Sequence, residues 1–203
     1  MMSIWRGDQP LILASQSRAR CMLLENAGLA CEAIPAAIDE RALQNEAGLA
    51  APYEVALHLA KAKAVAVSLG KPGSYVVGAD QTLAVGERLF NKPAGREQAM
   101  QQLSALAGRT HALHSAVTVV RDSKVVFAHV AVAWMAMRTL TEREIEAYLD
   151  AAGESVTSSV GAYQLEALGV HLFDRIDGDH FTILGLPLLP LLAYFREARL
   201  LAI

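Results

Sequence analysis

The sequence has few cysteines, little net charge and no long apolar run. Its two cysteines, Cys21 and Cys31, show no metal-ligand spacing and are typical of a reduced cytosolic protein. The formal net charge is −3 and no basic stripe with interleaved aromatic residues is present, so a nucleic-acid partner is not expected. The longest late apolar run, 181–195, contains Pro187 and Pro190 and is shorter than the ~20 residues of a membrane helix. Because the start of the chain also shows no signal-peptide pattern, we expect a cytoplasmic protein without a membrane partner.

The first strand-to-helix connection is not a Walker A loop, because no glycine lies between Gly7 and Gly28. The pattern predicts a strand over 11–14 and a helix over 18–27, with Ser17 as its N-cap and Gly28 as its stop. Four polar side chains gather at this helix start: Ser15, Ser17, Arg18 and Arg20. Helix N-termini favour anions and arginine matches phosphate geometry, so the connection is a candidate phosphate site. The alternative is a capped surface helix with solvated arginines.

A second candidate is the apolar run 75–79, which stops at Asp80. This pattern predicts a buried strand that presents the carboxylate at its C-terminal end, where α/β proteins bind ligands. Lys92 follows soon after, which suggests that the acid and the cation serve one anionic substrate. The alternative is a strand that ends in a turn-forming aspartate.

The remaining pattern alternates helices and strands. Helices are predicted over 18–27, 53–69, 96–106, 141–151 and 188–200. The helix over 141–151 is expected to begin with Thr141 as its N-cap and Glu144 at the capping-box position. Strands are predicted over 11–14, 31–34, 75–79, 82–85, 88–90, 111–120, 125–137 and 171–176. The strand 31–34 is expected to lead into a loop at Asp39-Glu40, and a turn over 121–124 is expected between the two long strands. Interleaved helices and strands indicate an α/β fold, and the two long adjacent strands indicate a mixed sheet flanked by helices. No linker or repeat divides the chain, so we expect a single domain over 1–203.

Seven short motifs occur in a fixed order along nearly the whole chain. They are Ser15-Gln16-Ser17-Arg18-Ala19-Arg20, Asp39-Glu40, Ala60-Lys61-Ala62-Lys63-Ala64, Gly78-Ala79-Asp80 with Lys92-Pro93, Leu103 to His111, Gly161-Ala162-Tyr163 and Gly185-Leu186-Pro187. Each is weak alone, but together the sequence resembles the Maf family of nucleoside triphosphate pyrophosphatases. The resemblance implies an inosine-triphosphatase-like architecture, with a strongly twisted sheet and a central cleft, and a homodimer.

The resemblance also implies the reaction. A nucleoside triphosphate would be hydrolysed at the α-phosphorus to a monophosphate and pyrophosphate, which would rid the nucleotide pool of modified nucleotides. From the residues alone, attack at the α- or the γ-phosphorus stays open. A phosphatase or a nucleotidyltransferase would also use a divalent metal ion to neutralise phosphate charge, so both stay open as alternatives. A nucleotide-binding regulatory protein with little catalysis, linked to cell-division arrest, is the other alternative.

The resemblance assigns the chemistry to particular side chains. Carboxylate oxygens suit Mg²⁺ or Mn²⁺, and Glu40 and Asp80 are the expected metal ligands, with Asp80 also the general base. The expected substrate contacts are Ser15, Ser17, Arg20, Lys63, Gln81, Lys92 and Glu166. Of the two helical lysines, Lys63 occupies the family's position, and Lys61 is expected on the surface.

The chain departs from the family pattern at several positions. Ala19 and Ser159 stand where the family has an arginine and a lysine, and Gln81 stands where it has threonine or serine. Glu166 replaces a glutamine, and an ionised glutamate can only accept hydrogen bonds, whereas an amide also donates. We therefore expect altered base selectivity.

Two histidines, His111 and His114, are three residues apart and could suggest a metal pair. At strand spacing, however, residues three apart point to opposite faces of a sheet. We therefore expect both to be structural.

Overall fold

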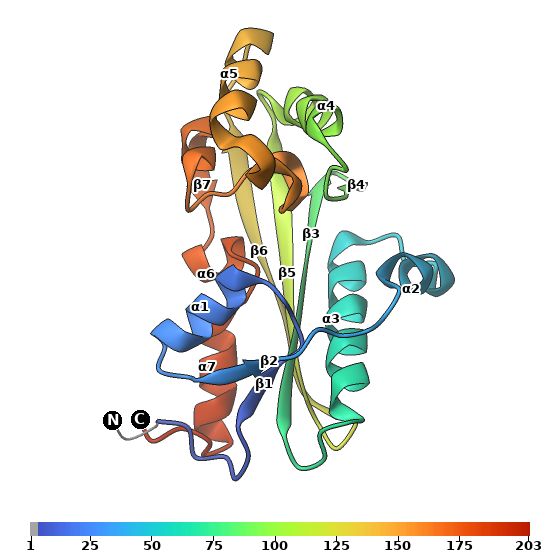
Figure 1. Ribbon diagram of the computed structural model, residues 1–203, viewed down its shortest axis with the longest axis vertical. Helices are drawn as coiled ribbons and strands as arrows, with labels where there is room; N and C mark the ends of the chain where they lie inside the picture. The colour runs from blue at the N-terminus through green and yellow to red at the C-terminus, as the bar shows by residue number, and fades with distance from the viewer. Residues whose placement is uncertain (1–3) are drawn as a thin grey trace. The chain divides into compact units, whose positions relative to one another are not determined.

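A computed structural model describes residues 4–203 as an α/β fold with a mixed sheet (Figure 1). The strands are β1 (Leu11–Leu13), β2 (Cys31–Ala33), β3 (Tyr75–Val85), β4 (Arg88–Phe90), β5 (Thr110–Arg121), β6 (Lys124–Met137) and β7 (Phe173–Asp177). The α-helices are α1 (Arg18–Asn26), α2 (Glu40–Ala47), α3 (Pro52–Ser68), α4 (Arg96–Leu106), α5 (Glu142–Ala152), α6 (His180–Ile183) and α7 (Leu188–Glu197). Three 3₁₀ helices span Gly153–Thr157, Val160–Ala162 and Leu168–Leu172. The predicted fold class is confirmed.

The sheet has seven strands in the order β2-β1-β3-β5-β6-β7, with β4 paired to β3. β1 runs parallel to both β2 and β3, whereas β3 with β4 and β6 with β7 are antiparallel. The sheet is therefore mixed, as the sequence predicts. Among the described residues, no helix is both long and apolar enough to cross a membrane.

The chain forms two compact units, and three strands contribute residues to both. The first unit comprises 4–81, 115–131 and 180–203, and the second comprises 82–114 and 132–179. β3 changes unit after Gln81, β5 after His114 and β6 after Ala131. That the two units act as the single domain expected from the sequence stays a prediction.

In the first unit, the alternation of β3 sorts its side chains onto two faces. Val77 and Ala79 belong to a core cluster with residues of α1 and α7, whereas Val76 belongs to a cluster with residues of α3. Because side chains alternate along a strand, Asp80 lies on the α3 face and Gln81 on the α1 and α7 face. The alternation of side chains along β3 thus places these two neighbouring polar groups beside different partners.

Gly78 lets α3 approach β3 closely. A Cβ at this position would lie 2.1 Å from the carbonyl oxygen of Ala60 and 2.8 Å from the Cβ of Ala64. Any side chain would therefore push the helix away from the strand. This close approach brings the α3 side chains within reach of the residue that follows on the same face, Asp80.

The second unit buries its own core between α4, α5 and the sheet. Its fully or nearly buried side chains include Leu103 and Leu106 of α4, Ile145 and Leu149 of α5, and Met135 of β6. α5 begins as predicted. Thr141 accepts from the backbone N–H of Glu144, and the Glu144 carboxylate accepts in return from the backbone N–H of Thr141.

Two local predictions were wrong, and one short helix was missed. β3 does not end at Asp80 but continues to Val85, because the predicted strands 75–79 and 82–85 form one strand that pairs with β4. Asp39 and Glu40 do not form a loop. Asp39 caps α2, and its carboxylate accepts from the backbone N–H of Ala42 at 3.0 Å, which satisfies a free donor at the helix start. The short helix α6 was not predicted at all, since four residues are too few to show a helical period.

Candidate functional site

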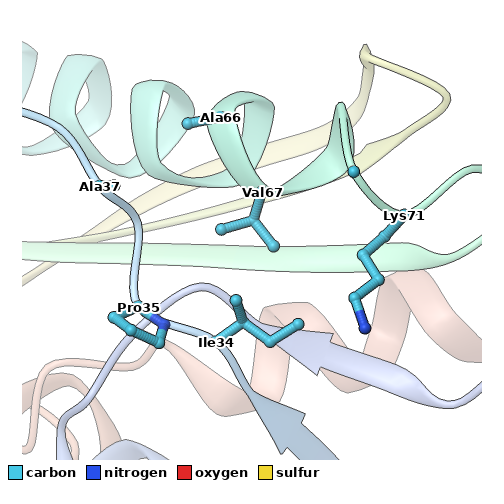
Figure 2. Close-up of a pocket in the computed structure, with 7 residues that line it drawn as sticks. Ile34, Pro35, Ala37, Ala66, Val67 and Lys71 are labelled. Carbon is cyan, nitrogen blue, oxygen red and sulfur yellow. The ribbon is translucent and has the colours of Figure 1, made fainter.

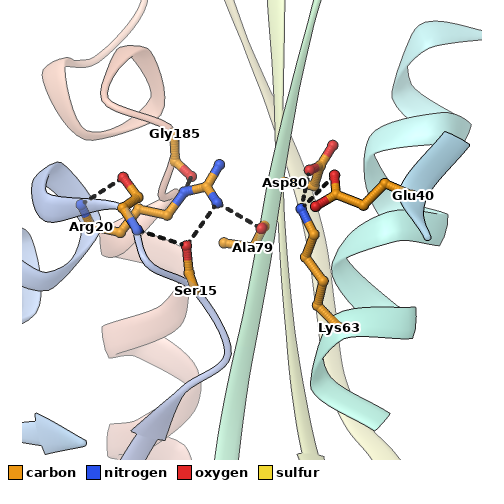
Figure 3. A network of polar contacts seen from close by, with 8 residues as sticks. Ser15, Arg20, Glu40, Lys63, Ala79, Asp80 and Gly185 are labelled. Atoms are coloured by element: carbon orange, nitrogen blue, oxygen red, sulfur yellow. Dashed lines mark hydrogen bonds and ion pairs between the residues drawn. The ribbon is translucent and has the colours of Figure 1, made fainter. Parts of the chain in front are cut away.

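Lys63 lies between the two predicted metal ligands. Its Nζ is 2.6 Å from Oδ1 of Asp80 and 3.0 Å from Oε2 of Glu40 (Figure 3). α3 supplies the lysine, β3 the aspartate and the first turn of α2 the glutamate. The fold thus gathers these three predicted residues from three elements of the first unit. Lys61 is exposed, as predicted.

The cluster is more buried on one side than on the other. The side chains of Lys63 and Asp80 are each 11% exposed, whereas that of Glu40 is 51% exposed. Burial raises the pKa of Asp80 above its ordinary value, while the charges of Lys63 and Arg20 act in the opposite direction. The result is a desolvated carboxyl group that two cations support.

Arg20 is held by backbone carbonyls as well as by a side chain. Its Nε donates to the carbonyl oxygen of Gly185 at 2.8 Å, and its Nη1 donates to that of Ala79 at 2.7 Å and to Oγ of Ser15 at 3.4 Å (Figure 3). Burial lowers the pKa of Arg20, and the charges of Asp80 and Glu40 oppose this shift. An arginine remains charged at neutral pH all the same.

The reason that Arg20 reaches Ala79 is the short length of β1. β1 ends at Leu13, and the backbone N–H of the next residue, Ala14, donates to the carbonyl oxygen of Val77 at 2.8 Å. Two residues further along β3, the carbonyl oxygen of Ala79 takes its hydrogen bond from Arg20. The guanidinium therefore lies at the carboxyl end of β1, where parallel strands of α/β proteins commonly bind ligands.

The start of α1 has the predicted cap. Oγ of Ser17 accepts from the backbone N–H of Arg20 at 3.4 Å, and Oγ of Ser15 accepts from the backbone N–H of Ser17 at 3.2 Å. Arg18 is exposed. Gly28 follows the helix with a φ of +74°, which suits its predicted role as the stop.

The amide of Gln81 is bonded within the protein. Its Nε2 donates to Oγ of Ser115 at 2.7 Å and to the carbonyl oxygens of Thr182 and Ile183, both at 3.0 Å. An amide nitrogen carries two hydrogens, so these three acceptors use it fully, and the substrate contact predicted for Gln81 stays a prediction.

Lys92 and Glu166 lie in the second unit, where both are exposed. Lys92 follows β4, and Glu166 lies between two 3₁₀ helices. Ser159, which stands where the family has a lysine, immediately precedes the 3₁₀ helix Val160–Ala162. The roles of Lys92 and Glu166 as substrate contacts stay predictions.

His111 is structural, as predicted. It is fully buried in the second unit, and its Nε2 lies 2.7 Å from the hydroxyl of Tyr163. Burial lowers the pKa of His111 to about 4, so the ring is neutral at neutral pH. Between Ile4 and Ile203 no three histidine, cysteine, aspartate or glutamate side chains gather as a metal site.

The donor set nevertheless fits one kind of metal ion. Glu40 and Asp80 offer two carboxylates that already share one cationic partner, the ammonium of Lys63. Mg²⁺ is commonly bound by one or two carboxylates, with water and substrate phosphates as its other ligands. Two protein carboxylates are therefore enough for an ion that binds together with a phosphate chain.

A separate pocket in the first unit contains none of the predicted site residues (Figure 2). Its volume is about 290 Å³, and it is lined by Ile34, Pro35, Ala37, Ala66, Val67, Gly70 and Lys71. Lys71 forms an ion pair with Glu32 at 3.0 Å. The lining is mainly apolar, and its one charged side chain, Lys71, is the one paired with Glu32.

The fold and the site define an α/β protein in which a lysine bridges two carboxylates and a partly buried arginine lies at the carboxyl end of β1. The chain matches the family model described as "Maf-like protein" over residues 10–198, and it belongs to this family. It is 65% identical over 201 residues to a nucleoside triphosphate pyrophosphatase of Rhodopseudomonas palustris, covering 99% of this chain and 100% of that protein. It is 64% identical over 202 residues to a protein of the same name from Bradyrhizobium diazoefficiens, covering 100% of both chains.

A further relative carries a more specific name. The 7-methyl-GTP pyrophosphatase of Rhizobium etli is 55% identical over 190 residues, covering 92% of this chain and 95% of that protein. Among solved structures, a HAM1 protein from Coxiella burnetii aligns with a TM-score of 0.42 and 15% identity, covering 63% of this chain and 72% of that chain.

Proposed function

We propose that the protein hydrolyses nucleoside triphosphates between the α- and β-phosphorus atoms, releasing a nucleoside monophosphate and pyrophosphate. The observation that carries the proposal is the cluster in which Lys63 bridges Asp80 and Glu40. The names of the relatives support the same reaction. A divalent metal ion, Mg²⁺ or Mn²⁺, would be held by Glu40 and Asp80, and it would neutralise phosphate charge when bound.

Asp80 is the proposed general base. Proton transfer to this carboxylate needs only a hydrogen bond between it and the attacking water. Lys63 holds Asp80 through Oδ1, which keeps the carboxylate in one orientation. This arrangement favours a base whose position is set before the substrate binds.

Arg20 is the residue that we propose binds the phosphate chain. Nε and Nη1 are bonded to the protein, whereas Nη2 makes none of these contacts and is the nitrogen offered to the phosphate chain. Ser15 and Ser17 lie at the same helix start, whose backbone N–H groups favour anions. Lys92 would add a further cation. Such donors stabilise the charge that develops on the leaving pyrophosphate.

The substrate would be a modified nucleotide, and removal of such nucleotides would be the cellular purpose. The relative named 7-methyl-GTP pyrophosphatase makes methylated guanine nucleotides the first candidates. Glu166 would favour bases that donate hydrogen bonds, because an ionised carboxylate only accepts. A homodimer and a cytoplasmic location remain part of the proposal.

The test is product analysis. The protein is incubated with canonical nucleoside triphosphates and 7-methyl-GTP, with and without Mg²⁺ or Mn²⁺, and pyrophosphate and orthophosphate are measured separately. We expect metal-dependent pyrophosphate with an equal amount of monophosphate. Asp80→Asn should lower turnover by about 10²- to 10⁴-fold, the usual effect of losing a general base, whereas Asp122→Asn at the distant β5–β6 turn should have no effect.

Other products would change the assignment. Orthophosphate alone would make the protein a phosphatase. Nucleotide binding without any product would favour a regulatory protein, with Ala19 and Ser159 as the lost cations. An unchanged nucleotide profile in Glu166→Gln would remove Glu166 from base selection.

A further inference from the structure

Three hydrogen-bond donors converge on one backbone carbonyl in the first unit. The carbonyl oxygen of Thr182 accepts from Oγ of Ser115 at 2.6 Å, from Nε2 of Gln81 at 3.0 Å and from the backbone N–H of Gly185 at 3.0 Å. Three donors from three different segments restrain the position of this carbonyl oxygen more firmly than a single donor would. Ser115 also accepts from Gln81, which closes the group into a ring of hydrogen bonds.

The same residue, Gly185, also binds Arg20, the side chain proposed to contact phosphate. The N–H of Gly185 is bonded to Thr182, while its carbonyl oxygen accepts from Nε of Arg20 at 2.8 Å. Its φ of +87° suits glycine, and a Cβ there would lie 3.1 Å from Nη2 of Arg20. The place of the guanidinium therefore depends on a turn that Ser115 anchors.

We propose that Ser115 is a positioning residue for Arg20, acting through the carbonyl of Thr182 and the peptide of Gly185. Ser115 lies on β5, is fully buried and touches neither Arg20 nor the Lys63 cluster in any hydrogen bond described above. Its hydroxyl fixes the turn, the turn fixes one carbonyl oxygen, and that oxygen sets the guanidinium plane. A misplaced guanidinium would leave Nη2 out of line with the phosphate oxygens.

The experiment is a double-mutant cycle between Ser115→Ala and Arg20→Ala. This inference rests on the proposed function, so wild-type pyrophosphate release is measured first. Ser115→Ala should lower kcat/KM by about 10- to 100-fold, as expected for a small displacement of a binding group, and the loss should divide between kcat and KM as it does in Arg20→Ala. In the Arg20→Ala background, Ser115→Ala should cause almost no further loss. Inorganic pyrophosphate binding, measured by calorimetry, should show the same dependence without catalysis.

The matched control is Thr118→Val. Thr118 lies on the same strand, is equally buried, and its hydroxyl makes no hydrogen bond, so its removal should leave kcat/KM unchanged. If Ser115→Ala does not fold, Ser115→Cys replaces it, because the thiol is of similar size and a weak donor. Additive losses in the cycle, or an effect of Ser115→Ala no larger than that of Thr118→Val, would overturn the proposal. A wild-type protein without pyrophosphate release but with normal pyrophosphate binding would contradict the proposed function alone.

Discussion

The two units differ in how they bury polar groups. In the first unit, Lys63 and Asp80 form a buried ion pair, and the charged side chain of Arg20 is partly buried. In the second, His111 and Tyr163 form a neutral pair, since burial lowers the pKa of His111 to about 4. Buried charges cost far more free energy than buried neutral groups, and an ion pair often fails to recover that cost. The first unit therefore carries a group that stability alone does not favour, and this is why function is assigned there.

The largest expected effect comes from removing the shared cation. Lys63→Met leaves Asp80 buried beside Glu40 without its ammonium partner, so we expect the free energy of unfolding to fall by about 3–5 kcal/mol. Chemical denaturation at neutral pH measures this. The double variant Lys63→Met/Asp80→Asn should regain much of the stability and none of the activity. Lys61→Met, on the exposed side of the same helix, is the control, and an equal loss there would show that the cluster is not special.

The neutral pair in the second unit, His111 with Tyr163, predicts that stability depends on pH. The pKa of His111 is lowered in the folded state from its ordinary 6.5 to about 4, so protons bind the unfolded chain more readily. Its contribution to stability is present above pH 6.5 and is lost as the pH falls toward 4, by about 3 kcal/mol in total. In His111→Gln this part of the acid destabilisation should disappear.

Denaturation curves at a series of pH values between 4 and 8 would measure the loss of stability that His111 causes in acid. His171→Gln is the control, because His171 is exposed in the same unit and should leave the wild-type pH dependence intact. Equal acid sensitivity of His111→Gln and the wild type would contradict the assignment. Turnover of His111→Gln near pH 8 should stay close to wild type, since neither His111 nor Tyr163 is among the proposed substrate contacts.

Much of the fold could be predicted from local patterns. α4 has the predicted bounds, Thr141 caps α5 as predicted, and Asp122 and Ser123 form the predicted turn between β5 and β6 with φ values of 49° and 61°. These features depend on neighbouring residues only. The continuation of β3 past Asp80 could not be seen, because pairing with β4 and the rest of the sheet decides where a strand ends.

The candidate site was predictable where side chains carry it. Lys63, Asp80 and Glu40 were chosen by residue type and motif, and the structure brings them together. The anchors of Arg20 were not predictable, because they are backbone carbonyls 59 and 165 residues away in sequence. Every residue has a carbonyl, so no pattern distinguishes Ala79 or Gly185 as an acceptor. Only the glycine itself, in a short motif, gave a signal.

A smaller effect is expected at the contact that positions α3. Gly78→Ala would place a Cβ 2.1 Å from the carbonyl oxygen of Ala60, so helix and strand must separate at a cost of about 1–3 kcal/mol. The separation would also draw Lys63 away from Asp80, so kcat should fall together with the thermal midpoint. Gly70→Ala is the control, because the nearest atom to its Cβ would be 3.9 Å away. A stable Gly78→Ala protein with lowered kcat would show that the spacing serves the site more than the core.

The smallest expected effect on stability comes from the carboxylate of Glu144, near the surface of the second unit. The pKa of Glu144 is lowered to about 2, first by the hydrogen bond from Arg138 and then by those from Thr141. Since protons bind the unfolded chain more readily here too, its contribution is present above pH 4.5 and is lost as the pH falls toward 2. Glu144→Gln should lower the thermal midpoint slightly near neutral pH and not at all near pH 2, whereas Glu146→Gln, exposed on the same helix, should follow the wild type throughout. A difference in thermal midpoint between Glu144→Gln and the wild type that persists to pH 2 would mean that the charge of Glu144 is not what stabilises the protein. The contrast between charged and neutral polar groups would then hold only for the buried groups of the two units.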